Sequence, residues 1–440
     1  MNATLRPIKN KAELGLAELF AAAGQRLPGG PAIAKLRAIA FDRFAAAGLP
    51  HPRIEAWKYT DLRRLMAEAK PLAALPDAAA RSRAADAGGL FAGLGFRRLV
   101  IIDGSFVPEL SDLADMEAGL TIQAMASAFA ADDLGQAARL SPAAEDSAAV
   151  SLNSALAADG VVVEIAPEAR IERPIHLAFV TTTEAASFVK SLVVIGNGAR
   201  ATLVESHEGP DRCGYQVNSV LQMLVGDRGE VEHVKVIQEG DAALHVGTLL
   251  GHVGSQAILR EYGLITGGAV VRNELTLRLA GERTTATLHG ASLLAGRQHA
   301  DTTLLVDHQA PHCESREVFK SVVDDEARAV FQGRITVRPD AQKTDGKMMA
   351  RGLLLSDAAE FNCKPELEIF ADDVQCGHGS TTGALDDELK FYLQARGIPE
   401  KQAEALLIQA FVGEVFESVA QDGVREALLA AMTAWLDGRG

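Results

Sequence analysis

A repeating arrangement of turns and short strands fills the middle of the chain, from residue 160 to about residue 380. Each unit has three or four aliphatic residues, a turn with glycine or aspartate, and a strand-like run. The turns fall at Gly196, Gly226, Gly254, Gly281, Asp325 and Asp357. The steps between them are 30, 28, 27, 44 and 32 residues, so one unit is expected to be missing in the long step. Such periods indicate stacked repeats, and the pattern alone leaves a parallel β-helix and a sandwich or barrel both open.

Helices are predicted on either side of this β-region. Apolar spacing predicts a first helix that stops near Gly24 and a second helix over residues 32–47. Residues 64–96 and 110–158 are rich in alanine and fit no single element. Three amphipathic helices are expected after Gly383. One helix would already cover the end of a stacked β-structure, so three exceed what capping requires.

Composition and charge exclude several classes of function. A chain of 440 residues can bury a large core, and two or three structural units are expected. The formal net charge of −15 argues against a nucleic-acid partner, which would need a clustered basic surface. No apolar run approaches the roughly 20 residues that span a bilayer, and the first residues lack a signal-peptide pattern. A cytoplasmic protein without membrane contact is therefore expected.

The four cysteines form no C-x-x-C pair and are expected to be free thiols in a reducing compartment. They are Cys213, Cys313, Cys363 and Cys376.

Cys376 and His378 are the strongest candidate metal ligands. They stand two residues apart in a strand-like run, so they share one face, about 7 Å apart at the Cα atoms. A soft thiolate and an imidazole suit iron, copper or zinc, but two ligands do not complete a site. A partner would have to supply the rest. The competing interpretations are a hydrogen-bonded structural histidine and a buried cysteine that acts as a small hydrophobic residue.

Other histidines are expected to be structural. One segment holds His299, His308, His312 and Cys313. Their spacing fits no zinc signature, and polar ladders along stacked strands with a turn at Pro311 explain them more simply. Four more are scattered along alternating strands: His207, His233, His245 and His252.

Motifs for nucleotide binding and hydrolysis are absent from the sequence. The segment at Gly346-Lys347-Met348 lacks the upstream glycine and the following hydroxyl of a phosphate-binding loop. No strand is followed by G-x-G-x-x-G, and there is no G-x-S-x-G. The chain is therefore not expected to be an enzyme or to hydrolyse ATP.

Three segments resemble the SufB/SufD family of iron–sulfur cluster assembly scaffolds. They are LLLSDAAEFNCKPELEIFADDVQCGHGSTTG (353–383), FYLQARGI (391–398) and EAWKYTDL (55–62). The resemblance covers nearly the whole chain and is strongest after His289. The C-x-H-G run is most similar to SufD, because SufB carries an acidic residue after its histidine. The chain departs from the family at Gly346, Met348 and Met349, where polar residues are more common.

The resemblance implies a right-handed parallel β-helix flanked by helical domains. The expected units are an N-terminal helical domain over 1–96, a β-helix core over 97–380 with an alanine-rich lead-in to about 159, and a C-terminal helical domain over 381–440. Trp57 and Tyr59 are expected to anchor the N-terminal helices to the core.

The resemblance also implies a non-catalytic scaffold in a SufB–SufC–SufD complex that builds iron–sulfur clusters and passes them to apo-proteins. His378 and Cys376 would hold a transient cluster together with a cysteine of SufB. SufC, an ABC-type ATPase, would supply ATP hydrolysis and dock on the C-terminal helices through Phe391, Tyr392, Arg396 and Ile398. ATP-driven dimerisation of SufC would open the SufB–SufD interface. Iron entry is assigned to this subunit, and persulfide sulfur to SufB.

Some features stay open at this point, and two alternative functions compete. Binding of reduced flavin by the complex and a homodimer of the isolated chain are both left open. One alternative is a protein-interaction platform without metal chemistry. The other is a polysaccharide-active β-helix enzyme, which needs an aromatic groove and convergent carboxylates. Aromatic residues are only 5% of the chain, and both tryptophans lie outside the β-region.

Overall fold

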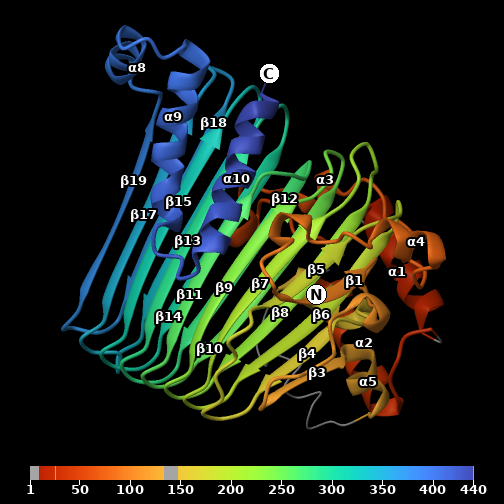
Figure 1. The fold of residues 1–440 in the computed structure, drawn as a ribbon. Helices are drawn as coiled ribbons and strands as arrows, with labels where there is room; N and C mark the ends of the chain where they lie inside the picture. The colour runs from red at the N-terminus through yellow and green to blue at the C-terminus, as the bar shows by residue number, and fades with distance from the viewer. Residues whose placement is uncertain (1–8, 25, 133–146, 440) are drawn as a thin grey trace, which may run out of the picture.

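The structure is a computed structural model that describes residues 9–24, 26–132 and 147–439. Its centre is a long stack of β-strands, with helices laid against the outside (Figure 1). The stack contains two sheets, and the chain passes from one sheet to the other at every turn from β4 onwards.

The larger sheet has ten strands, most of them parallel to their neighbours. In chain order they are β1 (Arg97–Ile102), β2 (Ser105–Phe106), β5 (Ile175–Val180), β7 (Arg200–Glu208), β9 (Glu230–Gln238), β11 (Ile258–Ile265), β13 (Thr285–Leu294), β15 (Glu314–Val323), β17 (Asp345–Leu354) and β19 (Gln375–Gly383). The nine-stranded sheet contains β3 (Leu120–Ala124), β4 (Val161–Ile165), β6 (Ala186–Ile195), β8 (Gln216–Val225), β10 (Leu244–Val253), β12 (Val270–Leu279), β14 (His299–His308), β16 (Arg328–Val337) and β18 (Glu360–Ile369). From β4 on, each strand pairs in parallel with the strand two places away in sequence, which confirms a parallel β-helix and excludes a sandwich or barrel.

Tight turns at one corner of the stack follow a regular period. Seven residues with positive φ mark this corner: Glu168, Gly198, Arg228, Gln256, Arg283, His312 and Lys343. The steps between them are 30, 30, 28, 27, 29 and 31 residues. Backbone bonds join successive corners; for example, the N–H of Arg228 donates to the carbonyl of Ser255 at 2.8 Å.

The prediction that one unit is missing from the stack is therefore wrong. Gly281 lies between β12 and β13, at the corner just described, whereas Asp325 lies between β15 and β16, at the opposite corner. The 44-residue step thus joins turns at two different corners. The next turn at the corner of Gly281 contains Pro311 and His312 but no glycine. Glycine and aspartate occur at both corners, because both residues tolerate the backbone conformations of tight turns.

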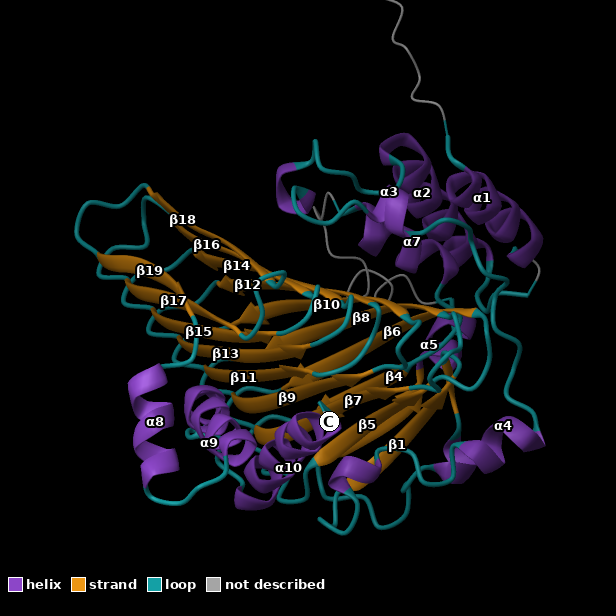
Figure 2. Ribbon diagram, turned by 90° about the horizontal axis from the view of Figure 1, so that it is seen from above, coloured by secondary structure: helices purple, strands orange, loops and turns teal. Residues whose placement is uncertain are grey.

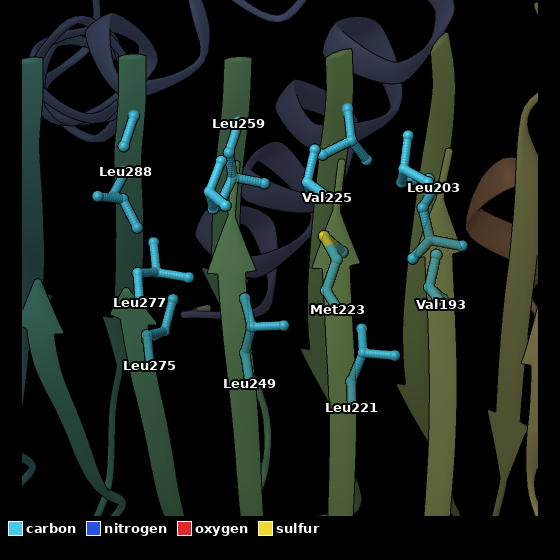
Figure 3. Close-up of a cluster of buried hydrophobic side chains, with 14 of the residues drawn as sticks. Val193, Leu203, Leu221, Met223, Val225, Leu249, Leu259, Leu275, Leu277 and Leu288 are labelled. Atoms are coloured by element: carbon cyan, nitrogen blue, oxygen red, sulfur yellow. The ribbon is translucent and has the colours of Figure 1, made fainter. Parts of the chain in front are cut away.

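The hydrophobic core fills the space between the two sheets. Alternate side chains of every strand point inward, and equivalent positions of successive strands form continuous rows. Figure 3 shows part of these rows, with Leu221, Leu249 and Leu275 from one sheet facing Leu203 and Leu259 from the other.

N-terminal helices cover the outside of the nine-stranded sheet. Helices α1 (Lys11–Ala23), α2 (Pro31–Ala47) and α7 (Ala148–Leu156) pack on Phe188 and Val246. Helix α1 ends within one residue of the predicted stop at Gly24. Helix α2 matches the predicted range 32–47 to within one residue at both ends. Shorter elements connect them to the stack: η1 (Glu55–Trp57), α3 (Leu62–Leu65), α4 (Ala78–Arg83), η2 (Gly89–Phe91), η3 (Pro108–Leu110) and α5 (Met125–Ala130).

Trp57 anchors this N-terminal region to the stack, as predicted. Its ring is buried, and the guanidinium of Arg272 on β12 lies over it at 4.3 Å from the ring centre. Arg272 also donates to the carbonyl of Ala56 at 2.7 Å and pairs with Asp301 at 2.6 Å. Tyr59 is only half-buried.

C-terminal helices cover the outside of the ten-stranded sheet. They are α8 (Asp387–Ala395), α9 (Glu400–Gly413), η4 (Glu414–Phe416) and α10 (Asp422–Gly438). Phe416 and Leu428 pack on outward-facing residues of the sheet such as Val234 and Tyr262. The expectation that one of these helices caps the stack is wrong: they lie along the sheet, and β18 and β19 stand at its uncovered end (Figure 2).

Candidate functional site

The last two strands form an open end of the β-helix. Within the described residues, β19 pairs only with β17, and β18 only with β16. Their side chains are exposed or half-buried throughout, in contrast with the strands before them. Phe370, in the turn between them, is 59% exposed. Such edges present unpaired backbone groups that can pair with another chain.

Cys376 and His378 lie on the inward face of β19. Cys376 pairs with Gly346, and His378 pairs with Met348, which is 2% exposed and belongs to the core between the sheets. Paired residues of parallel strands share a face, so both candidate ligands point toward the interior of the stack. No further coil covers them, and His378 is therefore exposed while Cys376 is half-buried.

The surroundings of Cys376 raise the pKa of its thiol, against the effect of a backbone hydrogen bond with Gly346. Burial raises the pKa of Cys376, and the nearby carboxyl groups of Asp345 and Glu317 raise it further. A thiolate is the form that binds metals. Cys376 can therefore become a good ligand only when a cation or a partner compensates the charge.

Cys363 is a third soft donor at this end, and sequence reasoning missed it. It pairs with the core residue Phe331, so it also faces inward, across the interior from β19. Burial raises the pKa of its thiol, against the effect of a hydrogen bond with Ser380. The signal was its spacing of two residues from Phe361 and four from Leu367, two apolar residues that share its face.

These three donors do not form a complete site. Among the described residues, only one group of three or more histidine, cysteine or acidic side chains brings its donor atoms within 4.8 Å of one another, and it lies elsewhere. Cys363, Cys376 and His378 are thus oriented to the same opening but need ligands from outside the chain.

His378 ends an inward-facing row that contains a buried acid. The row passes through Glu317 on β15 and Met348 on β17 to His378. Burial raises the pKa of Glu317 to about 8, against the opposing effects of Ser315 and Arg316. A neutral acid therefore lies two strands from His378, about 10 Å away at the Cα atoms.

Comparison with known proteins decides the family. The family described as "SUF system FeS cluster assembly, SufBD core domain" matches residues 178–411, and the "SufBD protein N-terminal region" matches residues 11–177. The chain belongs to the SufBD family. The resemblance in the three sequence segments is thereby confirmed.

Several relatives of this SufBD chain have names that refer to cluster assembly. An iron–sulfur cluster assembly SufBD family protein of Synechocystis sp. is 32% identical in an alignment of 396 residues that covers 86% of each chain. The iron–sulfur cluster assembly protein SufD of Escherichia coli is 29% identical, over 89% of this chain and 90% of its own. A SufBD family protein of Mycobacterium tuberculosis is 32% identical over 64% of this chain and 71% of its own. These relatives support a role in iron–sulfur cluster assembly.

The four candidate side chains around His308 make separate contacts in the structure of this SufBD chain. His299 hydrogen-bonds Thr60 at 2.8 Å, and His308 bonds Ser315 at 3.0 Å. His312 is exposed at a corner, and the thiol of Cys313 donates to the carbonyl of Gly281 at 3.1 Å. The four side chains serve the turns and strands separately, as predicted.

Three of the histidines that were predicted to be scattered converge inside the β-helix. His207, His233 and His245 are each at most 1% exposed and contact buried glutamates, whereas His252 is exposed. The sequence did not reveal this convergence, because it depends on the register between the two sheets, which brings the inward-facing positions of β7, β9 and β10 together.

The surface of α8 carries the residues predicted to bind a partner. Phe391 is 71% exposed and Tyr392 is 54% exposed, and α8 has no buried residue. Arg396 lies over the ring of Tyr392 at 4.5 Å, and Ile398 is half-buried. The competing interpretation, in which these aromatics pack only among the helices, does not hold. None of the helices that the structure describes is long and apolar enough to cross a membrane.

Proposed function

We propose that this SufBD chain is the SufD-type scaffold subunit of a SufB–SufC–SufD complex. The complex would assemble iron–sulfur clusters, which are its cargo, and transfer them to apo-proteins. The observation that carries the proposal is the open end of the β-helix, where Cys376 and His378 face inward and lack further ligands. The match to SufD of Escherichia coli extends over almost the full length of both chains.

The open edges of β18 and β19 are the proposed contact with SufB. Unpaired strand edges add strands from a partner through backbone hydrogen bonds. A partner docked there would place its own cysteine beside His378 and Cys376. It would also remove these donors from water, so that release of the cluster requires the interface to open.

SufC is the proposed source of the opening force. The chain has no phosphate-binding loop, and the exposed aromatics of α8 suit docking of an ATPase subunit. ATP-driven dimerisation of SufC would pull the two scaffold subunits apart. Iron would enter through this subunit, and sulfur would arrive as persulfide on SufB.

The proposal is tested by His378→Ala in the co-expressed complex. We expect the variant to fold and to bind both partners, because His378 is exposed and β17 holds β19 through the backbone. Cluster formation should be lost, as measured by acid-labile sulfide after anaerobic purification and by maturation of iron–sulfur enzymes in a strain without other assembly routes. Thr382→Ala, at an exposed position on the same face of β19, is the matched control.

Normal enzyme maturation by His378→Ala would contradict the proposal. A wild-type complex that forms but never contains acid-labile sulfide would instead favour the interaction platform without metal chemistry. The isolated chain should show neither ATPase activity nor stoichiometric acid-labile sulfide, since it supplies only part of the ligand set.

A further inference from the structure

A second group of metal-type side chains lies deep inside the β-helix. His207 on β7, Glu239 just after β9 and His245 on β10 are buried, and one donor atom from each lies within 4.8 Å of the others. β7 and β19 are separated by six strand-to-strand steps in the ten-stranded sheet. At about 4.8 Å a step, the group is about 29 Å from the open end. It is therefore independent of the proposed cluster site.

Neighbouring residues hold these three side chains in place. Glu205 bonds Nε2 of His207 at 2.5 Å, and the ring of Phe179 stacks on His207 at 4.5 Å between centres. The hydroxyl of Tyr215 donates to Oε2 of Glu239 at 2.8 Å. A carboxylate that bonds one imidazole nitrogen fixes the ring and leaves the other nitrogen for a metal. Tyr215 likewise leaves Oε1 of Glu239 directed at His245.

The group is not satisfied by the protein's own contacts. Nδ1 of His245 is 2.8 Å from Oε1 of Glu239, but Nε2 of the same ring has no hydrogen-bond partner although the residue is fully buried. A buried polar atom without a partner destabilises a fold, and a bound ligand removes that cost. Gly247 lies beside this nitrogen and carries no side chain: a Cβ there would be 2.8 Å from Nε2 of His245 and 2.7 Å from Nζ of Lys235.

Charge in this interior region also favours a cation. The carboxyl groups of Glu205, Glu239 and Glu261 lie around the three histidines. Two cationic groups face them: Lys235 pairs with Glu205 at 3.2 Å, and His233 contacts Glu205 and Glu261, which raise its pKa to about 9 against the effect of burial. One carboxylate is left in excess. Buried carboxylates in excess of cationic groups are stable only when a further positive charge compensates them.

We propose that His207, Glu239 and His245 bind one divalent first-row transition-metal ion inside the β-helix. Two imidazoles and one carboxylate are a donor set that zinc and ferrous iron share. Because the ligands come from β7, from the turn after β9 and from β10, the ion would join the two sheets. It would enter while the stack forms and would stay bound as a structural ion.

The test measures the number of metal ions bound per full-length chain in a variant that lacks the candidate ligands of the open end. The background is Cys376→Ala with His378→Ala, so that any ion held at the open end is removed. The chain is refolded with Zn²⁺ in one arm and with Fe²⁺ under anaerobic conditions in the other, dialysed against a weak chelator, and analysed by elemental mass spectrometry. We expect about one ion per chain in at least one arm, and the arm that retains it identifies the metal.

Glu239→Gln and His252→Gln form the matched pair of variants. Glu239→Gln should retain about tenfold less metal or lower, since a ligand is lost. His252→Gln removes an exposed histidine from the same strand as His245 and should retain the full amount. Circular dichroism confirms that each variant is folded.

Refolding with Co²⁺ provides a second measurement that needs no variant. A nitrogen- and oxygen-bound Co²⁺ in the wild-type interior should give visible d–d absorption that survives dialysis. Less than about a tenth of an ion per chain in both metal arms, together with no such absorption, would overturn the proposal. Equal metal retention by Glu239→Gln and His252→Gln would do the same.

Discussion

Glu317 is a residue whose ionisation should affect the stability of the fold. Its pKa is raised by burial to about 8, well above the value of 4.5 for an exposed glutamate. Between these two values the folded chain holds a proton that the unfolded chain has lost. The unfolding free energy should therefore fall as pH rises through this window, and the stabilisation is complete only below about pH 4.5.

We predict that Glu317→Gln removes this dependence on pH. In the wild type the Glu317 contribution to the unfolding free energy should fall by up to about 1.4 kcal/mol per pH unit between pH 5 and 8. Urea unfolding at several pH values measures the difference in slope between the two proteins. Glu314→Gln, which changes an exposed residue of the same strand, should keep the wild-type slope. Identical slopes for Glu317→Gln and the wild type would show that this acid is ionised in the folded state.

Residue patterns in the sequence identified Cys376 and His378 but missed Cys363 and the interior histidines. Two residues in one strand share a face by simple alternation, so the first pair follows from sequence alone. Cys363 faces the same opening only because β18 and β19 are the last strands of different sheets. His207 and His245 come from different sheets, so their contact depends on the number of residues in each coil. No local sequence pattern predicts which residues of the two sheets then face each other.

At the scale of elements, α8 differs from the other C-terminal helices. Helices α9 and α10 contribute a large buried contact with the ten-stranded sheet, which includes Ile408, Phe416 and Leu428. Removing all three helices would uncover that apolar surface and destabilise the stack. Point changes on α8 are therefore the sharper test of docking.

We predict that the double variant Phe391→Ala with Tyr392→Ala loses binding to the proposed SufC partner. Exposed aromatic and arginine side chains often dominate the binding energy of an interface, so the affinity should fall by about tenfold or more. Folding should change by less than about 0.5 kcal/mol, because both rings are exposed. Calorimetric titration measures the affinity. Leu406→Ala, at an exposed position of α9, is the control. Unchanged affinity of the double variant would place the docking surface elsewhere.

Helices at both ends could be predicted from the sequence more easily than the placement of the C-terminal ones. Apolar spacing and the stops near Gly24 and Gly48 define α1 and α2. The same patterns cannot say which surface a helix covers. The outward-facing row with Val234 and Tyr262 is apolar, which explains why the C-terminal helices pack there and leave the end of the stack uncovered.

At the scale of the whole molecule, the period of the turns allowed a repeat fold to be predicted, and the family resemblance selected the β-helix. The period alone could not, because glycine and aspartate occur at both corners of each coil. The turns used to measure the period therefore lie at one corner of the coils up to Gly281 and at the opposite corner from Asp325 on. A corner such as Pro311-His312 adopts the same backbone without glycine, and composition does not reveal it.

The uncovered end of the β-helix also implies a gradient of local stability along the stack. In a repeat structure each coil is held by its neighbours, and a terminal coil has only one. The C-terminal helices contact strands from β7 to β17, but β18 and β19 are outside this apolar contact. The coil that carries Cys376 and His378 should therefore open at the lowest cost.

We predict that hydrogen exchange reveals this fraying directly. Backbone amides of β18 and β19 should exchange about a hundredfold faster or more than those of β10 and β12, because local opening needs less free energy than global unfolding. Exchange followed by peptide mass spectrometry measures the rates. Uniform protection along the stack would contradict the gradient. If the gradient exists, the interior of the stack stays rigid while the last coil opens, and the proposed cluster would enter or leave without unfolding of the other coils.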